Sequence, residues 1–211
     1  MLPGKFIVIE GLEGAGKSSA ISIVEQALNN KQVSFDKTRE PGGTPLAEKL
    51  RELVKSADHS ELVTQETELL LMYAARSQLL VNKILPSLEK GLWVIGDRHD
   101  LSSRAYQGGG RQIPDDVIGG IANATLKGFT PDLTIYLDID PKIGLKRARA
   151  RGELDRIELE AMSFFERTRD KYLLIANHDD SIVIVDASQS MEQVHQDIEK
   201  HVNQFIDFHK S

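Results

Sequence analysis

The sequence predicts an α/β fold in which a mostly parallel β-sheet is covered on both faces by helices. Short, almost continuous apolar runs alternate with longer segments of helical periodicity along the 211 residues. Runs without polar alternation are typical of strands that are buried on both faces, and strands that alternate with helices indicate parallel βαβ units. We expect a single domain over residues 1–211, because this length suits one core of this kind better than two.

Five segments are predicted to be strands. KFIVIE, GLWVIGD, DLTIYLDI and SIVIVDA are almost wholly apolar, whereas VSFDKTRE is a weaker candidate because charged residues follow its apolar start. Three polar motifs, GLEGAGKS, TREPGG and DRHD, come directly after the first three strands. Ligands of parallel sheets bind beyond the carboxyl ends of the strands, so we expect these motifs to form one site. The predicted strands are residues 5–10, 33–40, 91–97, 132–139 and 181–187.

Segments of helical periodicity separate the strands. One of them begins with Pro141 in its first turn and has Asp140 before it as a candidate N-cap, which is typical of a helix start. The longest runs from residue 66 to residue 89. The predicted helices are residues 18–29, 66–89, 141–151, 157–176 and 190–208.

The composition narrows the classes of function. The chain is 40% apolar and 27% charged, as in an ordinary globular protein, and its formal net charge of −6 argues against a nucleic-acid partner. It contains no cysteine, which excludes disulfides and thiolate metal sites. No apolar run approaches the length of a membrane span or a signal peptide, so we expect a cytoplasmic protein without a membrane partner.

The loop after the first strand matches the phosphate-binding pattern G-x-x-x-x-G-K-[ST]. Glycines let successive backbone N–H groups curl around phosphate oxygens, and the following helix directs its positive end at the same anion. The lysine can reach the β- and γ-phosphates of ATP, and the serine hydroxyl can bind Mg²⁺. The predicted nucleotide-binding residues are Gly11, Leu12, Glu13, Gly14, Ala15, Gly16, Lys17 and Ser18.

The variable positions of this loop carry no basic residue, although phosphoryl transfer needs several cations around the moving group. The segment LKRARARGELDRIE supplies Arg147, Arg149, Arg151 and Arg156. Such a cluster is commonly a solvated face. Because arginine's planar fork suits phosphate oxygens, we instead expect a mobile lid over about residues 147–157. The spacing does not decide which arginine does which job.

Asp97 and Arg98 follow a strand end, where P-loop enzymes often hold Mg²⁺ through an acidic side chain. Asp97 could hold the metal together with Ser18, or it could cap a turn. Arg98 could bind a second phosphate, or it could form a surface ion pair.

Arg76 lies on the apolar stripe of the helix at 66–89, and a buried arginine needs a partner. The partner is either a nearby glutamate or an anionic ligand. Glu40 precedes Pro41 and two glycines, which indicates a tight loop close to a ligand and makes Glu40 a candidate substrate-binding residue.

Six ordered motifs together resemble one family, the bacterial thymidylate kinases. They are GLEGAGKS, TREPGGT, LLLMYAARSQ, DRHDLSSRAYQGGGRQ, PDLTIYLDI and RARARGELDRIE, and the likeness runs from about Phe6 to Tyr172. The resemblance implies a three-layer α/β/α fold of the P-loop kinase type with a five-stranded parallel sheet. It also implies transfer of a phosphoryl group from ATP to dTMP with Mg²⁺, and a homodimer packed through helices.

The resemblance also assigns residues at the phosphate end of the site. It places Glu13 near the reacting phosphate, Arg98 on the monophosphate, and Arg51, in a helix at 45–55, near the acceptor phosphate. In the family the arginine-rich segment is the lid, and this chain resembles the subclass that carries its catalytic arginine there. The candidate catalytic residues are Lys17, Glu13, Arg98, Arg149, Arg151 and Arg156.

At the nucleoside end, the resemblance places Arg76 close to thymine and puts Ser103 and Gln107 along the pocket. Tyr106 matches the tyrosine whose ring crowds the 2′ side of the sugar. Many members stack a phenylalanine on thymine where this chain has Met72, so either the thioether of Met72 or the ring of Tyr73 contacts the base.

Three other classes of P-loop protein are less consistent with the sequence. A GTPase would need N-K-x-D, and the nearest string is NKIL. A nucleic-acid-dependent ATPase would need a basic surface. A small-metabolite kinase would share the loop and lid, but it would use a carboxylate to take a proton from a hydroxyl acceptor.

Overall fold

A computed structural model describes residues 3–56, 61–150 and 155–210 of the chain. Its centre is a five-stranded sheet in the order β2-β3-β1-β4-β5, and every neighbouring pair is parallel. The predicted fold class and all five strands are confirmed. The strands are β1 (Phe6–Gly11), β2 (Phe35–Arg39), β3 (Trp93–Asp97), β4 (Leu133–Asp138) and β5 (Ile182–Asp186).

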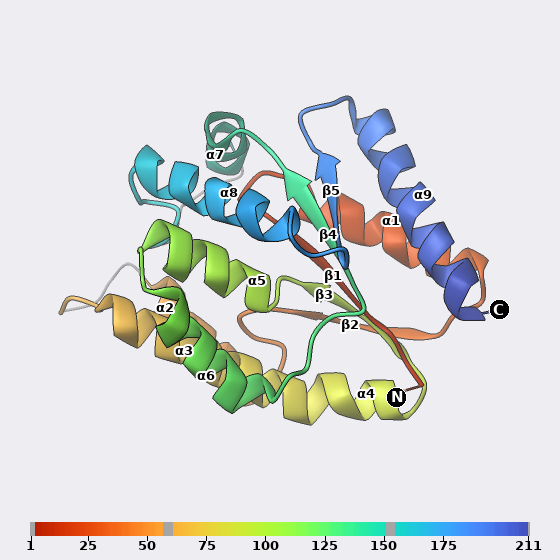
Figure 1. Cartoon of the computed structure of the whole chain (residues 1–211), viewed down its shortest axis with the longest axis horizontal. Helices are drawn as coiled ribbons and strands as arrows, with labels where there is room; N and C mark the ends of the chain where they lie inside the picture. Colours follow the sequence, from red (N-terminus) through yellow and green to blue (C-terminus); the bar gives the residue numbers. More distant parts are fainter. Residues whose placement is uncertain (1–2, 57–60, 151–154, 211) are drawn as a thin grey trace.

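Helices cover both faces of the sheet, as Figure 1 shows. On one face, α1 (Lys17–Asn30) packs against α9 (Met191–Lys210). The other face is covered by α4 (Leu85–Glu89), α5 (Asp100–Ser103) and α8 (Met162–Ala176), and α3 (Gln65–Leu79) packs against α2 (Pro45–Lys55) and α6 (Asp115–Leu126). The last helix, α7 (Pro141–Arg149), lies beyond the carboxyl end of β4 (Figure 1). None of the described helices is long and apolar enough to cross a membrane.

The central strand β1 explains why its sequence is apolar without alternation. Ile7 and Ile9 belong to the core that contains α1 and α9, whereas Phe6 and Val8 belong to the core under α3, α4 and α6. Because successive side chains of a strand point to opposite faces, a sheet covered on both faces needs apolar residues at every position. Glu10 is the exception, and it is completely buried.

Two predicted helices have different bounds in the structure. The segment 66–89 is interrupted by a π-helical stretch, Leu80–Ile84. Pro86 follows in α4, and a proline lacks the N–H and crowds the preceding turn, so the wider turn accommodates it. The helix predicted from residue 157 begins only at Met162, because the Asp155 carboxylate accepts from the backbone of Ile157 and Glu158 and closes a turn there.

Three neighbouring helical segments were not predicted, of which α5 is the first. After α5 the chain continues as a π-helical stretch, Arg104–Gly110, and α6 follows. Both contain glycines, which disfavour helices in isolation. In the π-helical stretch the glycines permit close packing on α8, since a Cβ on Gly109 or Gly110 would lie within 2.7 Å of atoms of that helix. Tertiary contact therefore outweighs local propensity here.

Glycine also permits the contact between α7 and the phosphate-binding loop. A Cβ on Gly144 would lie 2.5 Å from the carbonyl oxygen of Glu13, so Gly144→Ala must push the loop and the helix apart. We expect a loss of about 1–3 kcal/mol in the free energy of unfolding, measured in urea. The control is Gly119→Ala in α6, which has open space around it and should be neutral or stabilising by up to ~1 kcal/mol. Equal urea midpoints for the two variants would contradict this account.

Candidate active site

The glycine loop connects β1 to α1 at the carboxyl edge of the sheet. Gly14 and Gly16 have φ of 74° and 94°, a region that residues with a Cβ rarely adopt. No side chain caps the start of α1, so its first N–H groups remain available to an anion. The loop therefore has the backbone that its sequence pattern predicts.

The Lys17 ammonium lies inside this loop. Its Nζ donates to the carbonyl oxygens of Gly11 and Leu12 at 3.1 and 3.0 Å. Burial lowers the pKa of Lys17 to about 8, and repulsion by Arg98 adds to this, although nearby carboxylates oppose it. The lysine is thus a cation whose charge is incompletely compensated, and anionic phosphates would stabilise it.

We expect nucleotide binding at pH 8.5 to take up protons, because burial lowers the pKa of Lys17 to about 8 and bound phosphates raise it again. Calorimetric titration with a non-hydrolysable ATP analogue, in buffers of different ionisation enthalpy, measures the uptake. A Lys17→Met variant should show none. The same uptake in both proteins would assign the proton to another group.

Lys17 and Arg98 line the same cavity, of about 190 Å³, at the carboxyl edge of the sheet. Its walls come from the glycine loop, the ends of β2 and β3, α2, α3, α5 and the segment Arg104–Gly110, together with Asp155, Ile157 and Glu158. We call this cavity the cleft. The predicted site residues that line the cleft are Glu13, Lys17, Glu40, Arg51, Met72, Asp97, Arg98, Tyr106 and Gln107. Two further cations, Arg39 and Lys55, line it without having been predicted.

Arg98 connects the glycine loop to Tyr106 across the cleft. It donates to the Glu13 carboxylate at 2.7 Å and to the Tyr106 hydroxyl at 3.2 Å, and Tyr106 in turn donates to the other Glu13 oxygen at 2.7 Å. Burial by itself lowers the pKa of Arg98, but its anionic and phenolic neighbours raise it overall, so the guanidinium stays charged. Arg98 also has a φ of 72°, an uncommon conformation that costs energy and is typical of functional positions.

The buried Arg76 has a glutamate as a partner, which is one of the two alternatives that the sequence left open. Its Nε donates to Glu40 at 2.6 Å, and another nitrogen donates to the Ser103 hydroxyl at 2.9 Å. Burial raises the pKa of Glu40, but Arg76 and His99 outweigh it, so the pKa of this carboxyl lies below its usual range. Arg76 itself does not line the cleft, whereas Glu40 does.

The structure also distinguishes the two candidates for contact with the base. Met72 lines the cleft. Tyr73 turns away, and its hydroxyl donates to Asp100 at 2.7 Å while its ring lies under Arg76. Met72 is therefore the residue of the two that a ligand in the cleft can touch.

Ser103, which the resemblance places along the pocket, lies deeper than its neighbour Ser102, which was not predicted. Ser103 is completely buried and does not line the cleft. Ser102 does line it, accepts from Arg98 at 3.1 Å and donates to Glu10 at 2.6 Å. Glu10 was not predicted as part of the site. The signal was present, because it is the one charge in the apolar strand FIVIE.

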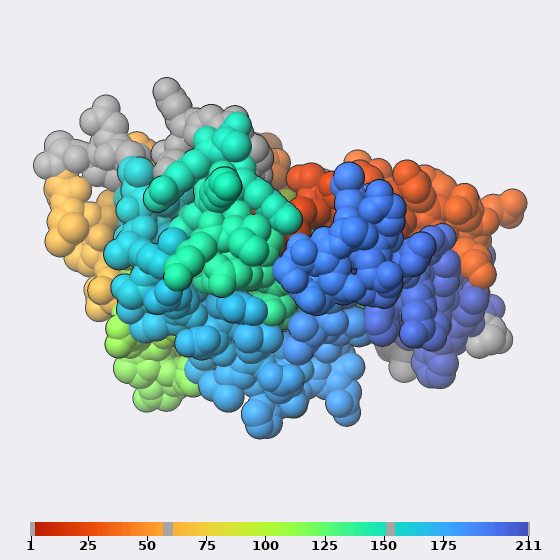
Figure 2. All heavy atoms as spheres, turned by 90° about the horizontal axis from the view of Figure 1, so that it is seen from above, coloured from red at the N-terminus to blue at the C-terminus, as the bar shows by residue number. Residues whose placement is uncertain are grey.

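The predicted lid arginines lie in different places. Arg149 is exposed at the end of α7, and Arg151 lies outside the described residues. Arg156 does not line the cleft. It donates to Glu68 at 2.7 Å and to the carbonyl of Val54 at 3.0 Å, and it borders a separate hollow. Figure 2 shows the molecule from above, with α7 (teal) near the middle of the view. Arg147 in α7 donates to the carbonyl oxygen of Gly14 in the glycine loop at 3.4 Å.

Asp97 and Ser18 offer oxygens suited to a hard cation. The Oδ1 of Asp97 is buried and has no hydrogen-bond partner among the described residues, and Ser18 is exposed near the start of α1. Within the described part of the chain, no three His, Cys, Asp or Glu side chains form a metal cage.

Comparison with known proteins identifies the family. The family model "Thymidylate kinase" matches residues 9–198. The chain is 66% identical to a thymidylate kinase of Colwellia psychrerythraea over 206 residues, which covers 98% of this chain and 97% of the relative. It is 61% identical to that of Alteromonas mediterranea, covering 97% of this chain and 93% of the relative, and 64% identical to that of Pseudoalteromonas translucida, covering 92% and 93%. The glycine loop, the cleft and these likenesses agree: the chain belongs to the thymidylate kinase family.

Proposed function

We propose that this protein transfers the γ-phosphoryl group of ATP to dTMP and so produces ADP and dTDP. The observation that carries the proposal is the cleft itself, in which Lys17 from the phosphate-binding loop and Arg98 from the end of β3 face one cavity. A donor on the loop and an acceptor in the cleft would meet between these two cations. The family to which the chain belongs supports the same pair of substrates.

In the proposed reaction, ATP lies on residues 11–18 and dTMP enters the cleft. Arg98 and Arg51 hold the acceptor phosphate in line with the γ-phosphorus. An oxygen of dTMP forms a bond to that phosphorus, the bond to the bridging oxygen of ADP breaks, and Lys17 compensates the charge on the transferring group. The acceptor is already an anion, so positioning and electrostatics supply the rate and no general base is required.

The nucleoside would lie between Met72 and Tyr106, with the Gln107 amide at its edge. The Gln107 side chain is completely buried and its Nε2 donates to Glu68 at 2.8 Å, so its contact with the nucleoside would need that side chain to move. Tyr106 is held by Glu13 and Arg98, so its ring is fixed where we propose that it excludes a 2′-hydroxyl. Arg76 and Ser103 would not touch the nucleoside. Arg76, which donates to both Glu40 and Ser103, would instead orient the Glu40 carboxylate that lines the cleft.

We further propose that Asp97 and Ser18 hold Mg²⁺, directly or through water. When bound, the ion supplies positive charge to the oxygens of the transferring phosphoryl group.

We also propose that residues 147–157 close over ATP as a lid, with Arg149 and Arg151 reaching its phosphates. Arg156 could join them only by leaving Glu68. We expect the reaction to take place in the cytoplasm, where ATP is available.

The proposed function is tested by measuring ADP release with ATP and a panel of acceptors. The panel comprises dTMP, dUMP, UMP, dCMP, AMP and a sugar such as ribose. We expect kcat/KM to be highest for dTMP and lower for UMP than for dUMP, because Tyr106 crowds the 2′ position. A higher value for a sugar or for AMP would contradict the assignment and favour another small-molecule kinase.

We propose in addition that the protein is a homodimer that pairs through α3 and α6. These adjacent helices expose Leu70 (56%) and Val117 (45%) on either side of an apolar groove. Leu70→Asp would place a charge in that interface, so we expect it to shift the protein from dimer to monomer in sedimentation velocity. The control is Leu174→Asp on α8, which is equally exposed (54%) and lies elsewhere. A parent protein that sediments as a monomer would refute the pairing.

A further inference from the structure

Glu68 in α3 is a buried carboxylate that has no role in the proposed reaction so far, and it does not line the cleft. Its Oε1 accepts from Nε2 of Gln107 at 2.8 Å and from Nε of Arg111 at 3.2 Å. Its Oε2 accepts from Nη2 of Arg111 at 2.9 Å and from Nη2 of Arg156 at 2.7 Å. One carboxylate thus joins α3 to two later parts of the chain.

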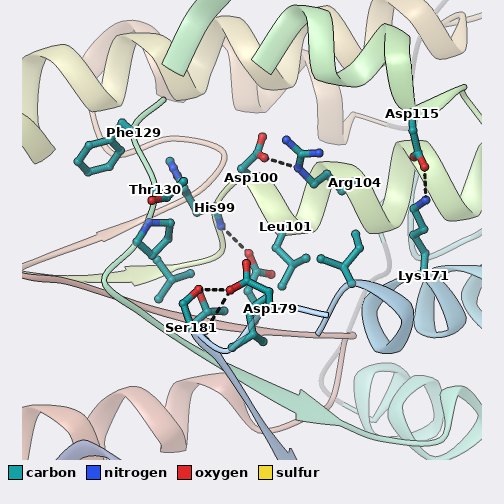
Figure 3. Close-up of a pocket in the computed structure, with 16 residues that line it drawn as sticks. His99, Asp100, Leu101, Arg104, Asp115, Phe129, Thr130, Lys171, Asp179 and Ser181 are labelled. Carbon is teal, nitrogen blue, oxygen red and sulfur yellow. Dashed lines mark hydrogen bonds and ion pairs between the residues drawn. The ribbon is translucent and has the colours of Figure 1, made fainter. Parts of the chain in front are cut away.

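The ion pairs of Glu68 are more shielded from water than those near the surface. Figure 3 shows a second cavity, of about 350 Å³, under α5 and α8, with the Asp115–Lys171 pair at its rim. There the Asp115 side chain is 68% exposed, so water and salt weaken the pair. The partners of Glu68 are 11% exposed at Arg111 and 19% at Arg156, so these attractions are screened less.

The charges around Glu68 are balanced. Burial raises the pKa of Glu68, but hydrogen bonds from Arg111 and Gln107 outweigh it, so the pKa lies below its usual range and the group stays ionised. Arg111 also pairs with Glu160. Two carboxylates therefore compensate two guanidinium groups, Arg111 and Arg156. A neutral side chain at residue 68 would leave both arginines beside one carboxylate, at a cost, since partly buried charges need partners.

Arg156 is also held from a second side, by the end of α2. Its Nε donates to the carbonyl oxygen of Val54 at 3.0 Å, and its backbone N–H donates to that of Lys55 at 3.2 Å. The Lys55 ammonium in turn pairs with Asp155 at 2.7 Å. Residues 155 and 156 therefore lie against α2, while Glu68 holds the Arg156 guanidinium from α3.

The neighbours of Arg156 form part of the cleft wall. Asp155, Ile157 and Glu158 line the cleft, whereas Arg156 between them does not and pairs with Glu68 instead. The Asp155 carboxylate accepts from the backbone N–H groups of Ile157 and Glu158, each at 3.0 Å, so the turn is held together as one unit. The position of this wall therefore follows from the position of Arg156.

We propose that Glu68 is a positioning residue of the phosphoryl transfer, which fixes the cleft wall at residues 155–158 by holding Arg156. The inference rests on the proposed function, because the cleft is where dTMP is expected to bind. Arg156 then serves as the fixed end of the proposed lid and does not reach the phosphates of ATP.

Hydrogen exchange measures this anchor without any substrate. In Glu68→Gln we expect the amide of Arg156 to exchange at least ~10-fold faster than in the parent, since a lost hydrogen bond to a charged group favours local opening by about this factor. The increase should exceed any change in the amides of β1, which report on general unfolding. Glu66→Gln, at an exposed position of the same helix, should leave the rate unchanged. An unchanged rate in folded Glu68→Gln would overturn the proposal.

Steady-state kinetics test whether the anchor serves the reaction. Glu68→Gln should raise the KM for dTMP by ~10-fold and change the KM for ATP by less than ~3-fold, because the wall borders the cleft whereas ATP lies on residues 11–18. The control is Asp138→Asn, which removes a carboxylate that also pairs with an arginine, Arg169 at 2.8 Å, but lines neither cavity. It should keep both KM values. The same KM for dTMP in folded Glu68→Gln as in the parent would refute the positioning role.

A double-mutant cycle tests whether Glu68 acts through Arg156. The loss of kcat/KM in Glu68→Gln combined with Arg156→Met should be at least ~5-fold smaller than the product of the single losses. The cycle also separates this route from Gln107, the other side chain that Glu68 holds. Additive losses would refute the route through Arg156. A fall of ~10²-fold in kcat for Arg156→Met alone, with normal kinetics in Glu68→Gln, would make Arg156 a phosphate contact and overturn the proposal.

Arg156→Met also replaces Glu68→Gln if the latter does not fold, as judged by circular dichroism. It removes the same ion pair while Glu68 keeps Arg111 and Gln107, so the same changes in exchange at residue 156 and in the KM for dTMP are expected.

The anchor and the proposed function can fail separately. A parent that phosphorylates dTMP, with unchanged exchange in Glu68→Gln, would refute the anchor alone. A parent that prefers another acceptor, with faster exchange at residue 156 in the variant, would refute the proposed function and support the anchor. The effect on KM is then measured with that acceptor, and an unchanged KM there would refute the positioning role.

Discussion

Replacing Lys17 by methionine is expected to lower kcat by at least ~10²-fold, the loss typical of removing one preorganised charge from a transition state. Lys17 is the only lysine in the glycine loop, and its ammonium already lies among the carbonyl oxygens of Gly11 and Leu12. Methionine keeps the length and apolar stem of the side chain and removes the charge. Steady-state kinetics with ATP and dTMP measure the effect.

The matched control is Lys142→Met, which removes an exposed lysine from α7. Its kcat should stay within ~3-fold of the parent's, because an exposed charge outside the cleft adds little to a shielded transition state. Thermal melts of both variants show whether either loss is one of folding. If Lys17→Met kept the parent's kcat while remaining folded, the loop would bind nucleotide without contributing to the chemistry.

Replacing Arg98 by methionine is expected to lower kcat/KM for dTMP by ~10³-fold or more, which corresponds to about 4 kcal/mol of transition-state stabilisation. Two losses add. The acceptor phosphate loses its proposed guanidinium contact, and the Glu13 carboxylate, which Arg98 meets at 2.7 Å, becomes an uncompensated negative charge beside that phosphate. The KM for ATP should change by less than ~3-fold, because in the proposed reaction Arg98 holds the acceptor phosphate whereas ATP lies on residues 11–18.

Arg169→Met is the control for this change. Arg169 also pairs with a carboxylate, Asp138 at 2.8 Å, but it lines neither cavity. We expect normal kinetics from it. A loss in Arg98→Met that appeared only in the KM for ATP would move Arg98 from the acceptor to the donor side of the reaction.

Much of the fold could be predicted because its signals are local. A strand buried on both faces must be apolar at every position, and the four runs of this kind became strands, as did the more polar segment that forms β2. The helices after Asp100 and Asp115 were missed because their glycines carry no helical signal, and those at residues 108–110 make sense only once α8 packs against them. The break before Pro86 is a third case, in which a proline was accommodated by a local π turn and did not end the helix.

Parts of the candidate site could likewise be predicted from local sequence, whereas other parts depended on tertiary packing. The glycine loop and Asp97–Arg98 could be located from sequence, because each follows a strand end and strand ends share one edge of a parallel sheet. The choice between Met72 and Tyr73, or between Ser102 and Ser103, depends on a rotation of about 100° along one helix. A helix packed on several sides gives no sequence signal for which of two adjacent residues faces the cleft.

The sequence alone determined that a phosphate-binding loop follows the first strand of a parallel sheet, because consecutive residues form both the loop and the strand. Tertiary structure alone decided which charges meet. Arg98 pairs with a glutamate 85 residues away, and Arg156 with one 88 residues away, outside the cleft. Such pairs depend on the order of the strands and on how the helices pack. Neither can be predicted from the residues next to an arginine in the sequence. The physical reason is that a backbone conformation is a local property, whereas the partner of a buried charge is set by the whole fold.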